Sequence, residues 1–360
     1  MPRTFYTSNA QKELWSLLGL FESTQFVSER LKSKFHDLSA NDIQSRTNNI
    51  VYSIRQAREF FDSSERVSLL TSPLLLSYGM LNLSKALVYF LSDESVDFGN
   101  FFKSHGLTIP YVGNKQTLAD IRVRFKGTGT YVQLAGIYNE NNYTEVEISL
   151  KDIISQIPDL REIFILTYNE YPRVIPLKKI EYGYSMIDLS DNHQKIWSEI
   201  LDMEKLFQKS GYSVESYGTN ISILQSAAAT KTLSELDLAV KSIMGIEYFR
   251  TIPKINSKLI LLKEQSLYYI LIFSYGVLAR YHVIEWGKYI DPNLSKEAEI
   301  INKSIFVSKE RFLHLAVNLL YNEDFEFKLS VEQVEKSKRE MADYVYDDIT
   351  ERLNRDLKKL

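Results

Sequence analysis

The spacing of hydrophobic residues changes twice along the chain. From about residue 10 to 105, apolar residues recur every three or four positions, for example at Leu14, Leu17 and Phe21, which predicts amphipathic helices. One helix is expected from about Pro73 to Phe90, because a proline in the first turn has no N–H to leave unsatisfied. This helix is apolar on most sides, which is typical of the central helix of a lobe.

The middle of the chain has a period of two instead. Apolar and charged residues alternate over 121–125, which predicts a half-buried strand. A turn at 127–129 and a return strand at 131–134 follow in the prediction. Alternation at 146–150 and a short apolar run at 163–166 indicate further strands. Residues 110–225 are therefore expected to form a small, largely antiparallel sheet with one or two short helices.

Helical spacing returns from about residue 232 and continues through an apolar core helix within 259–290 and another helix at 297–321. The tail, 331–360, has 8 acidic and 7 basic residues and one apolar stripe in which hydrophobic residues recur every four positions. Such a stripe packs either on this chain or on a partner.

These patterns predict an α+β, mainly helical protein in which two helical regions pack together with a small antiparallel sheet insert between them. The predicted boundaries are 1–108 for the N-terminal helical region, 109–228 for the insert, 229–330 for the C-terminal helical region and 331–360 for an amphipathic C-terminal helix.

The amino-acid composition excludes several classes of function. The 360 residues contain no cysteine, which excludes disulfides, thiolate metal sites and cysteine nucleophiles, and five dispersed histidines do not predict a multi-histidine metal site. The net charge of −3 is not that of a dedicated duplex-DNA binder, although it allows a local basic patch. The most apolar run, 267–278, is shorter than the roughly 20 residues of a membrane span, so we expect a cytoplasmic protein without membrane association.

Few motifs of known chemistry occur. The chain lacks a Walker-type phosphate loop, a His-Glu-x-x-His metal motif and a Gly-x-Ser-x-Gly elbow. The glycines in 126–130 are expected to form a turn, not a phosphate-binding loop. Residues 324–328 contain a Glu-x-Lys element of the kind that metal-dependent nucleases carry on a strand, but a solvated loop is the expected structure. No particular cofactor is predicted.

One polar stripe lies on the most enclosed helix. Tyr78, Asn82 and Lys85 are spaced by four and three residues, so they lie on one side of an otherwise apolar helix. Burying such groups is costly unless they are paired. Lys85 is a candidate for binding a phosphate or a carboxylate, and Asn82 for holding a neighbouring backbone; a structural polar network is the alternative.

Two further groups are candidates for catalysis. Arg280 and His282 close the apolar core helix and can share a site only if that helix ends there, Arg280 holding a phosphate and His282 transferring protons. The alternative is a local role at the helix end. His105, next to Gly106 in a predicted loop, has room to face a cleft or is an ordinary turn residue.

These segments resemble the YaaC-like family of bacterial proteins. Residues 73–87 are similar to its signature helix, and 105–107, 148–159 and 278–286 to three further elements in the same order. The resemblance covers roughly residues 50–320. It implies a poorly characterised protein whose relatives are similar to components of anti-phage systems, and whose helices loosely resemble HEPN domains, which often cleave RNA.

The HEPN resemblance is incomplete. HEPN ribonucleases carry an arginine, four to six residues and then a histidine on one helix, and only Arg30 and His36 fit this spacing. Leu31 follows the arginine where a polar residue is usual, and Arg280 has no histidine at the required distance. These departures put HEPN-type catalysis in doubt.

The resemblance leads to three hypotheses. The first is a subunit of an intracellular defence complex that acts on nucleic acid, including as a nuclease, with Lys85 and Arg280 binding phosphate and His105 and His282 transferring protons. The expected partners are further copies of the chain, other defence proteins such as an ATPase, and nucleic acid. The alternatives are a non-catalytic scaffold or sensor that binds proteins, and a small-molecule enzyme that uses the polar stripe.

Overall fold

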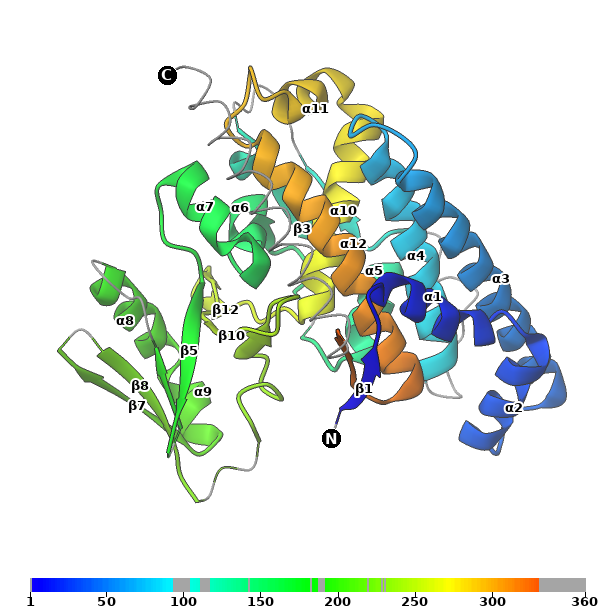
Figure 1. The fold of residues 1–360 in the computed structure, drawn as a ribbon, viewed down its shortest axis with the longest axis horizontal. Helices are drawn as coiled ribbons and strands as arrows, with labels where there is room; N and C mark the ends of the chain where they lie inside the picture. Colours follow the sequence, from blue (N-terminus) through cyan, green and yellow to red (C-terminus); the bar gives the residue numbers. More distant parts are fainter. Residues whose placement is uncertain are drawn as a thin grey trace, which may run out of the picture.

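Four long helices lie side by side and form the main body of the molecule (Figure 1). The computed structural model describes residues 2–92, 104–110, 117–141, 143–181, 183–186, 192–218, 220–227, 229 and 231–329. Helix α4 contacts each of the other three bundle helices, as expected for the central helix. The bundle helices are α3 (Ala40–Ser64), α4 (Ser72–Leu91), α10 (Glu264–Tyr281) and α12 (Ala298–Tyr321).

The start of α4 follows the predicted signal. Pro73 occupies the first turn, although Thr71 makes no side-chain capping hydrogen bond. By length and composition α4 could cross a membrane, but most of its apolar window is buried among the other helices. Its hydrophobicity is therefore that of a core helix.

Short helices and a strand pair precede and close the bundle. Oxygen atoms of the Asn9, Ser23 and Ser39 side chains accept hydrogen bonds from the first turns of α1, α2 and α3. Residues 325–328, within the 324–328 segment that was expected to be a solvated loop, form a strand that pairs in parallel with the N-terminal strand, where Phe5 contacts Phe325 and Phe327. These elements are α1 (Ala10–Leu20), α2 (Thr24–Lys34), β1 (Arg3–Tyr6) and β13 (Phe325–Lys328).

Part of the predicted insert joins the main core. Residues 131–134 lie in a helix and not in a return strand, and 163–166 are also helical. Both predictions were wrong because a run of four apolar residues is too short to show whether its spacing is that of a helix or of a strand. The elements are a sheet in the order β2 (Leu107–Thr108), β3 (Arg122–Phe125) and β4 (Glu147–Ser149), with α5 (Thr130–Ile137), α6 (Leu150–Ile154), η3 (Pro158–Leu160) and α7 (Arg161–Tyr168).

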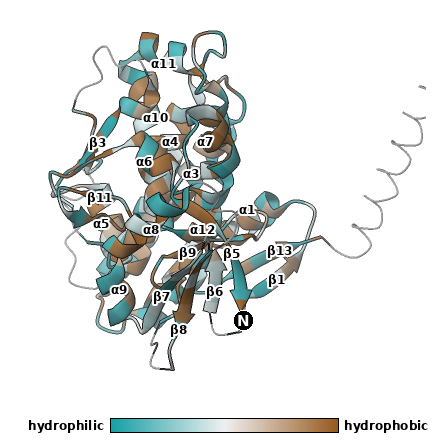
Figure 2. Cartoon of the chain, turned by 90° about the vertical axis from the view of Figure 1, so that its left-hand side faces the viewer, coloured by the Kyte–Doolittle hydropathy of each residue, from teal (hydrophilic) through white to brown (hydrophobic). Residues whose placement is uncertain are grey.

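A six-stranded antiparallel sheet with its own hydrophobic core lies beside the bundle (Figures 1 and 2). The helix expected from about residue 232 is wrong, because two strands of this sheet and a hairpin precede α10. The strand order is β7 (Tyr212–Tyr217), β8 (Asn220–Gln225), β6 (Gly183–Met186), β5 (Val174–Ile180), β10 (Glu247–Arg250) and β9 (Ala239–Lys241). The same part of the chain also contains the helices α8 (His193–Asp202) and α9 (Glu204–Lys209) and a hairpin of β11 (Lys254–Ile255) and β12 (Lys258–Leu259).

A buried carboxylate joins the insert to the bundle. Glu297, just before α12, is 1% exposed. It accepts hydrogen bonds from the backbone of Leu118 (2.7 Å) and Ala119 (3.1 Å) in η2 (Leu118–Asp120) and from the Tyr168 hydroxyl (2.7 Å). The predicted C-terminal helix at 331–360 lies outside the described residues.

The close contact between α3 and α4 generates a stability prediction. A Cβ atom at Gly79 would lie 2.6 Å from Cδ2 of Phe61, a ring with no exposed surface. We expect Gly79→Ala to lower the free energy of unfolding by about 1–3 kcal/mol, because the ring must shift within a packed core. Urea denaturation measures this change.

Gly287 in α11 (Val283–Ile290) is the matched control, because a Cβ atom there has no neighbour within 4 Å. Gly287→Ala should raise the free energy of unfolding by up to about 1 kcal/mol, the usual gain of alanine over glycine in a helix. Equal stabilisation by both substitutions would show that α3 and α4 are not in close contact in solution.

Candidate functional site

Tyr78, the first residue of the polar stripe on α4, contacts the end of α10. Nη1 of Arg280 donates a 2.6 Å hydrogen bond to the Tyr78 hydroxyl. The Tyr78 ring also stacks on Phe60 of α3, with ring centroids 5.5 Å apart. Residues 202 positions apart in sequence are thus brought together by the packing of α4 and α10.

Arg280 is exposed in the last turn of α10. Its guanidinium lies 4.9 Å from the centre of the Tyr281 ring, and it makes no ion pair with the residues that the structure describes. The helix ends directly after it, at Tyr281. The positive charge of Arg280 is therefore available to a ligand.

His105 lies in a loop that is fixed by a tight crossing. Its carbonyl accepts a 3.0 Å hydrogen bond from the Tyr131 N–H. A Cβ atom at Gly129, where φ is +124°, would lie 2.3 Å from the nitrogen of Gly106, so only glycine fits. The 126–130 segment therefore joins β3 to α5 while supporting the His105 loop. The His105 ring packs against Phe273, with centroids 5.3 Å apart, and the residue is exposed.

Three positive charges act on this histidine. Partial burial, followed by the charges of Lys85, Arg280 and Lys126, lowers the pKa of His105 below its usual value of 6.5. Burial also lowers the pKa of Lys85. The neutral form of the His105 imidazole is therefore favoured, because burial and these charges disfavour its protonation. These four residues, Lys85, His105, Lys126 and Arg280, are called the cationic cluster below.

A buried hydroxyl lies beside the cluster. Ser77, Met80, His105, Tyr269 and Phe273 line a cavity of about 10 Å³, which is the space of a single water molecule. The hydroxyl of Tyr269 is buried and has no hydrogen-bond partner among the described residues. It is a polar group that a ligand or water at His105 can satisfy.

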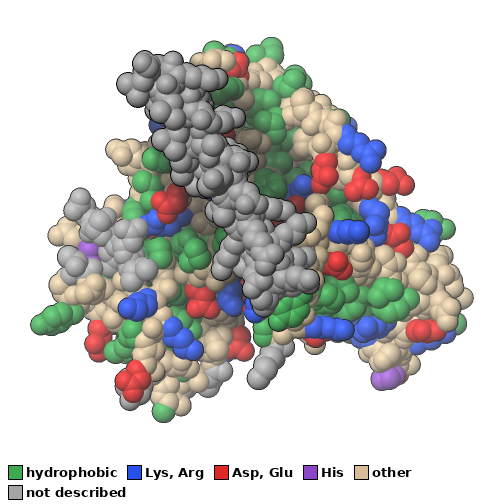
Figure 3. All heavy atoms as spheres, in the orientation of Figure 1, with side chains coloured by type: hydrophobic (Ala, Val, Ile, Leu, Met, Phe, Trp, Pro, Cys, Tyr) green, Lys and Arg blue, Asp and Glu red, His purple; other side chains and the backbone are tan. Residues whose placement is uncertain are grey.

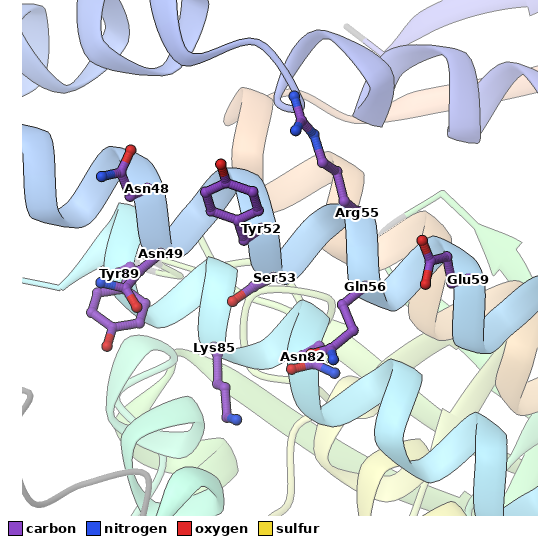
Figure 4. A pocket seen from close by; sticks show the side chains of 10 residues that line it. All are labelled: Asn48, Asn49, Tyr52, Ser53, Arg55, Gln56, Glu59, Asn82, Lys85 and Tyr89. Carbon is purple, nitrogen blue, oxygen red and sulfur yellow. The ribbon is translucent and has the colours of Figure 1, made fainter.

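Asn82 and Lys85 also line a polar groove between α3 and α4 (Figure 4). The groove has a volume of about 780 Å³ and is open to solvent. Lys85 connects it to the cationic cluster, since its charge also acts on His105. The other lining residues are Asn48, Asn49, Tyr52, Ser53, Arg55, Gln56, Glu59 and Tyr89.

The remaining candidates are not brought into the cluster. His282 separates α10 from α11 and makes no side-chain hydrogen bond with a described residue. Arg30 lies over the rings of Phe26 and Tyr321, and α2 ends at Lys34, so His36 is not on the same helix. In β13 the Glu-x-Lys element forms a local ion pair, Glu326–Lys328, at 3.0 Å.

Several residues of the site were not among the candidates. Lys126 belongs to a predicted strand and turn, and Tyr269 to an apolar run, so neither has a local signal. The groove residues of α3 have a weak one, because polar residues recur at helical spacing at Asn49, Tyr52 and Gln56. Within the part of the chain that the structure describes, no group of three His, Asp or Glu side chains could hold a metal ion.

The fold and the site thus define a mainly helical α+β protein with an exposed histidine on which three cationic side chains act. On the face drawn in Figure 3, acidic and basic side chains are mixed. A family model described as YaaC-like Protein matches residues 19–320, and the chain belongs to this family. Comparisons with curated proteins and with solved structures give no match.

Removing a positive charge from the cluster should raise the pKa of His105. Arg280→Met eliminates one of the charges that disfavour the protonated imidazole, so the pKa should move back toward 6.5. Titration of the His105 ring protons by NMR measures this shift. Lys288→Met on α11, which does not act on His105, is the control. An unchanged pKa in Arg280→Met would place Arg280 away from His105 in solution.

Asn82 makes a second prediction possible, because its side chain is 6% exposed and makes no hydrogen bond with any described residue. At a position that is 6% exposed, an apolar side chain of similar size buries hydrophobic surface where the amide gains no hydrogen bond from the described residues. We expect Asn82→Leu to raise the free energy of unfolding by up to about 1 kcal/mol in urea denaturation.

Asn48→Leu, at an exposed position of the same groove, should give no such gain. A loss of more than about 2 kcal/mol in Asn82→Leu would mean that Asn82 belongs to a structural hydrogen-bond network instead.

Proposed function

We propose that this YaaC-like protein binds a nucleic-acid strand through the cationic cluster and cleaves RNA there, with His105 as the general base. The observation that carries the proposal is that His105 lies beside Lys126, whose N–H donates a 3.0 Å hydrogen bond to the Gly106 carbonyl, and that the charges of Lys85, Lys126 and Arg280 act on its imidazole. Arginine and lysine are the side chains that hold phosphate, and an imidazole near its pKa is suited to proton transfer.

Each member of the cluster has a distinct part. The guanidinium of Arg280 holds a phosphate oxygen in forked geometry, while Lys126 and Lys85 add positive charge without fixing orientation. Negative charge increases on the phosphate as the transition state forms, so these cations lower the barrier. Tyr78 orients Arg280 by accepting its hydrogen bond, at 2.6 Å.

RNA is the favoured substrate because its ribose contains the nucleophile. His105 takes the proton of a 2′-hydroxyl, the 2′-oxygen forms a bond to phosphorus, and the bond from phosphorus to the 5′-oxygen breaks. The leaving 5′-oxygen takes a proton from water, and His105 later returns its own proton to solvent. The products are a 2′,3′-cyclic phosphate and a 5′-hydroxyl.

The biological setting is part of the same proposal. We place the protein in the cytoplasm, as a subunit of a bacterial anti-phage complex that contains further copies of this chain or other defence proteins such as an ATPase. The support is the family resemblance together with a site suited to phosphodiesters. We assign His282 no role in the cleavage step itself; it can act only as a proton donor to a ligand that extends past Arg280.

Cleavage assays test the proposal directly. The purified full-length chain, alone and with the proteins encoded beside it, is incubated with end-labelled single-stranded RNA and with DNA of the same sequence. RNA should be cut to products with cyclic phosphate ends. His105→Gln should lower the rate by about 10²–10⁴-fold and Arg280→Met by about 10²–10³-fold. The acid limb of the pH–rate profile should lie below pH 6.5, because the pKa of His105 is lowered.

His193→Gln on α8 is the matched control and should cleave at the wild-type rate. If His105→Gln also retains that rate, or if no preparation cleaves RNA, the catalytic proposal is rejected. Binding of RNA without cleavage would instead support the scaffold or sensor alternative.

A further inference from the structure

The groove between α3 and α4 is lined by amide, aromatic and charged side chains, which is the composition of a binding site and not of a packing defect. Asn82 lies at its base, 6% exposed, and its side-chain amide has no hydrogen-bond partner among the described residues. Its amide atoms are not among the fully buried polar atoms that lack a partner, so they are open to the groove. An amide at the base of a groove offers a donor and an acceptor to a ligand.

Gln56 presents a second carboxamide across the groove, from α3 (Figure 4). It too has no hydrogen-bond partner among the described residues and is exposed. A carboxamide offers one donor and one acceptor side by side, which is the pattern on the edge of a nucleobase. Two such groups, on facing helices, can read a planar heterocycle from its edge.

An aromatic ring completes this arrangement. Tyr52 is 63% exposed at the mouth of the groove. Arg55 holds the ring in place, since its guanidinium lies 5.5 Å from the ring centre while Nη2 donates to the carbonyl of Glu22 at 2.8 Å. Exposed aromatic rings on a positively charged path are platforms on which unpaired bases stack.

The groove and the cationic cluster have Lys85 in common. Lys85 lines the groove and its charge acts on His105. Among the described residues that line the groove, Lys85 and Arg55 are the cations and Glu59 is the one carboxylate. A phosphate at the cluster and a base in the groove can therefore belong to one nucleotide or to neighbouring nucleotides.

We infer that the α3–α4 groove is a subsite for an unpaired nucleobase of the strand whose phosphate the cationic cluster holds. The inference rests on the proposed function, and it narrows the substrate to single-stranded nucleic acid. Base edges in a double-stranded RNA helix are paired, and its deep groove does not admit side chains. The base stacks on Tyr52, and its edge is read by Asn82 and Gln56.

Two binding measurements on the full-length chain test this subsite. The first is fluorescence anisotropy with a labelled 2′-O-methyl RNA strand, which cannot be cleaved because it lacks the attacking hydroxyl. Tyr52→Ala and Gln56→Ala should each weaken binding by roughly tenfold and leave its dependence on salt concentration unchanged. Arg280→Met should weaken binding and also reduce the salt slope by about one charge. Tyr217→Ala, at an exposed tyrosine on β7, is the control.

The second measurement uses free nucleosides, which carry no phosphate and so bypass the cationic cluster. Saturation-transfer NMR should detect binding of at least one of adenosine, guanosine, cytidine and uridine, and Tyr52→Ala and Asn82→Leu should abolish it. Maltose is titrated in parallel, because amides and tyrosines also bind sugars.

The outcomes separate the two proposals. If the groove variants bind the strand as tightly as the wild type while Arg280→Met binds it more weakly, the base subsite is rejected. The proposed function is not affected by that result. Nucleoside binding that depends on Tyr52, with no RNA cleavage, supports the subsite and rejects catalysis. Binding of maltose and not of nucleosides, or of neither strand nor nucleosides, overturns the subsite.

Discussion

The enclosure of α4 by α3, α10 and α12 is the constraint on which the rest of the structure depends. A helix that is apolar on most sides is stable only when other helices cover it. Close covering requires small residues at the contacts. Gly79 meets the Phe61 ring of α3, and Gly276 meets Ser77, so that a Cβ atom at either glycine would come within 2.6 Å of a neighbour. These contacts fix α4 between α3 and α10.

The same enclosure explains where the polar side chains of α4 lie. Polar groups on a covered helix are tolerated only where they reach a seam between helices or a loop, because full burial without partners is costly. Tyr78 reaches the end of α10, Asn82 reaches the seam with α3, and Lys85 lines that seam while its charge acts on His105. The polar stripe thus spreads over three neighbouring surfaces instead of forming one network, and the groove and the cationic cluster meet at Lys85.

Sequence patterns predicted the long elements well and the short ones poorly. The helices at 72–91 and 298–321 were expected almost to the residue, since many turns of consistent spacing outweigh local exceptions. The runs at 131–134 and 163–166 were assigned to strands and are helical, and β13 was expected to be a loop. Its strand exists because β1, more than 300 residues earlier, supplies its hydrogen-bond partner.

By itself, the sequence determined the mainly helical α+β class, the central helix with its polar stripe and the family to which the chain belongs. Only the tertiary structure decided that the charges of Lys85, Lys126 and Arg280 act on His105, and that Tyr52 and Gln56 of α3 line one groove with Asn82 of α4. The reason is physical. Periodicity records which face of an element is buried, whereas these groups meet through the packing of α4 against α3 and α10 and through the loop crossing at Gly129, and no local pattern encodes contacts between distant segments.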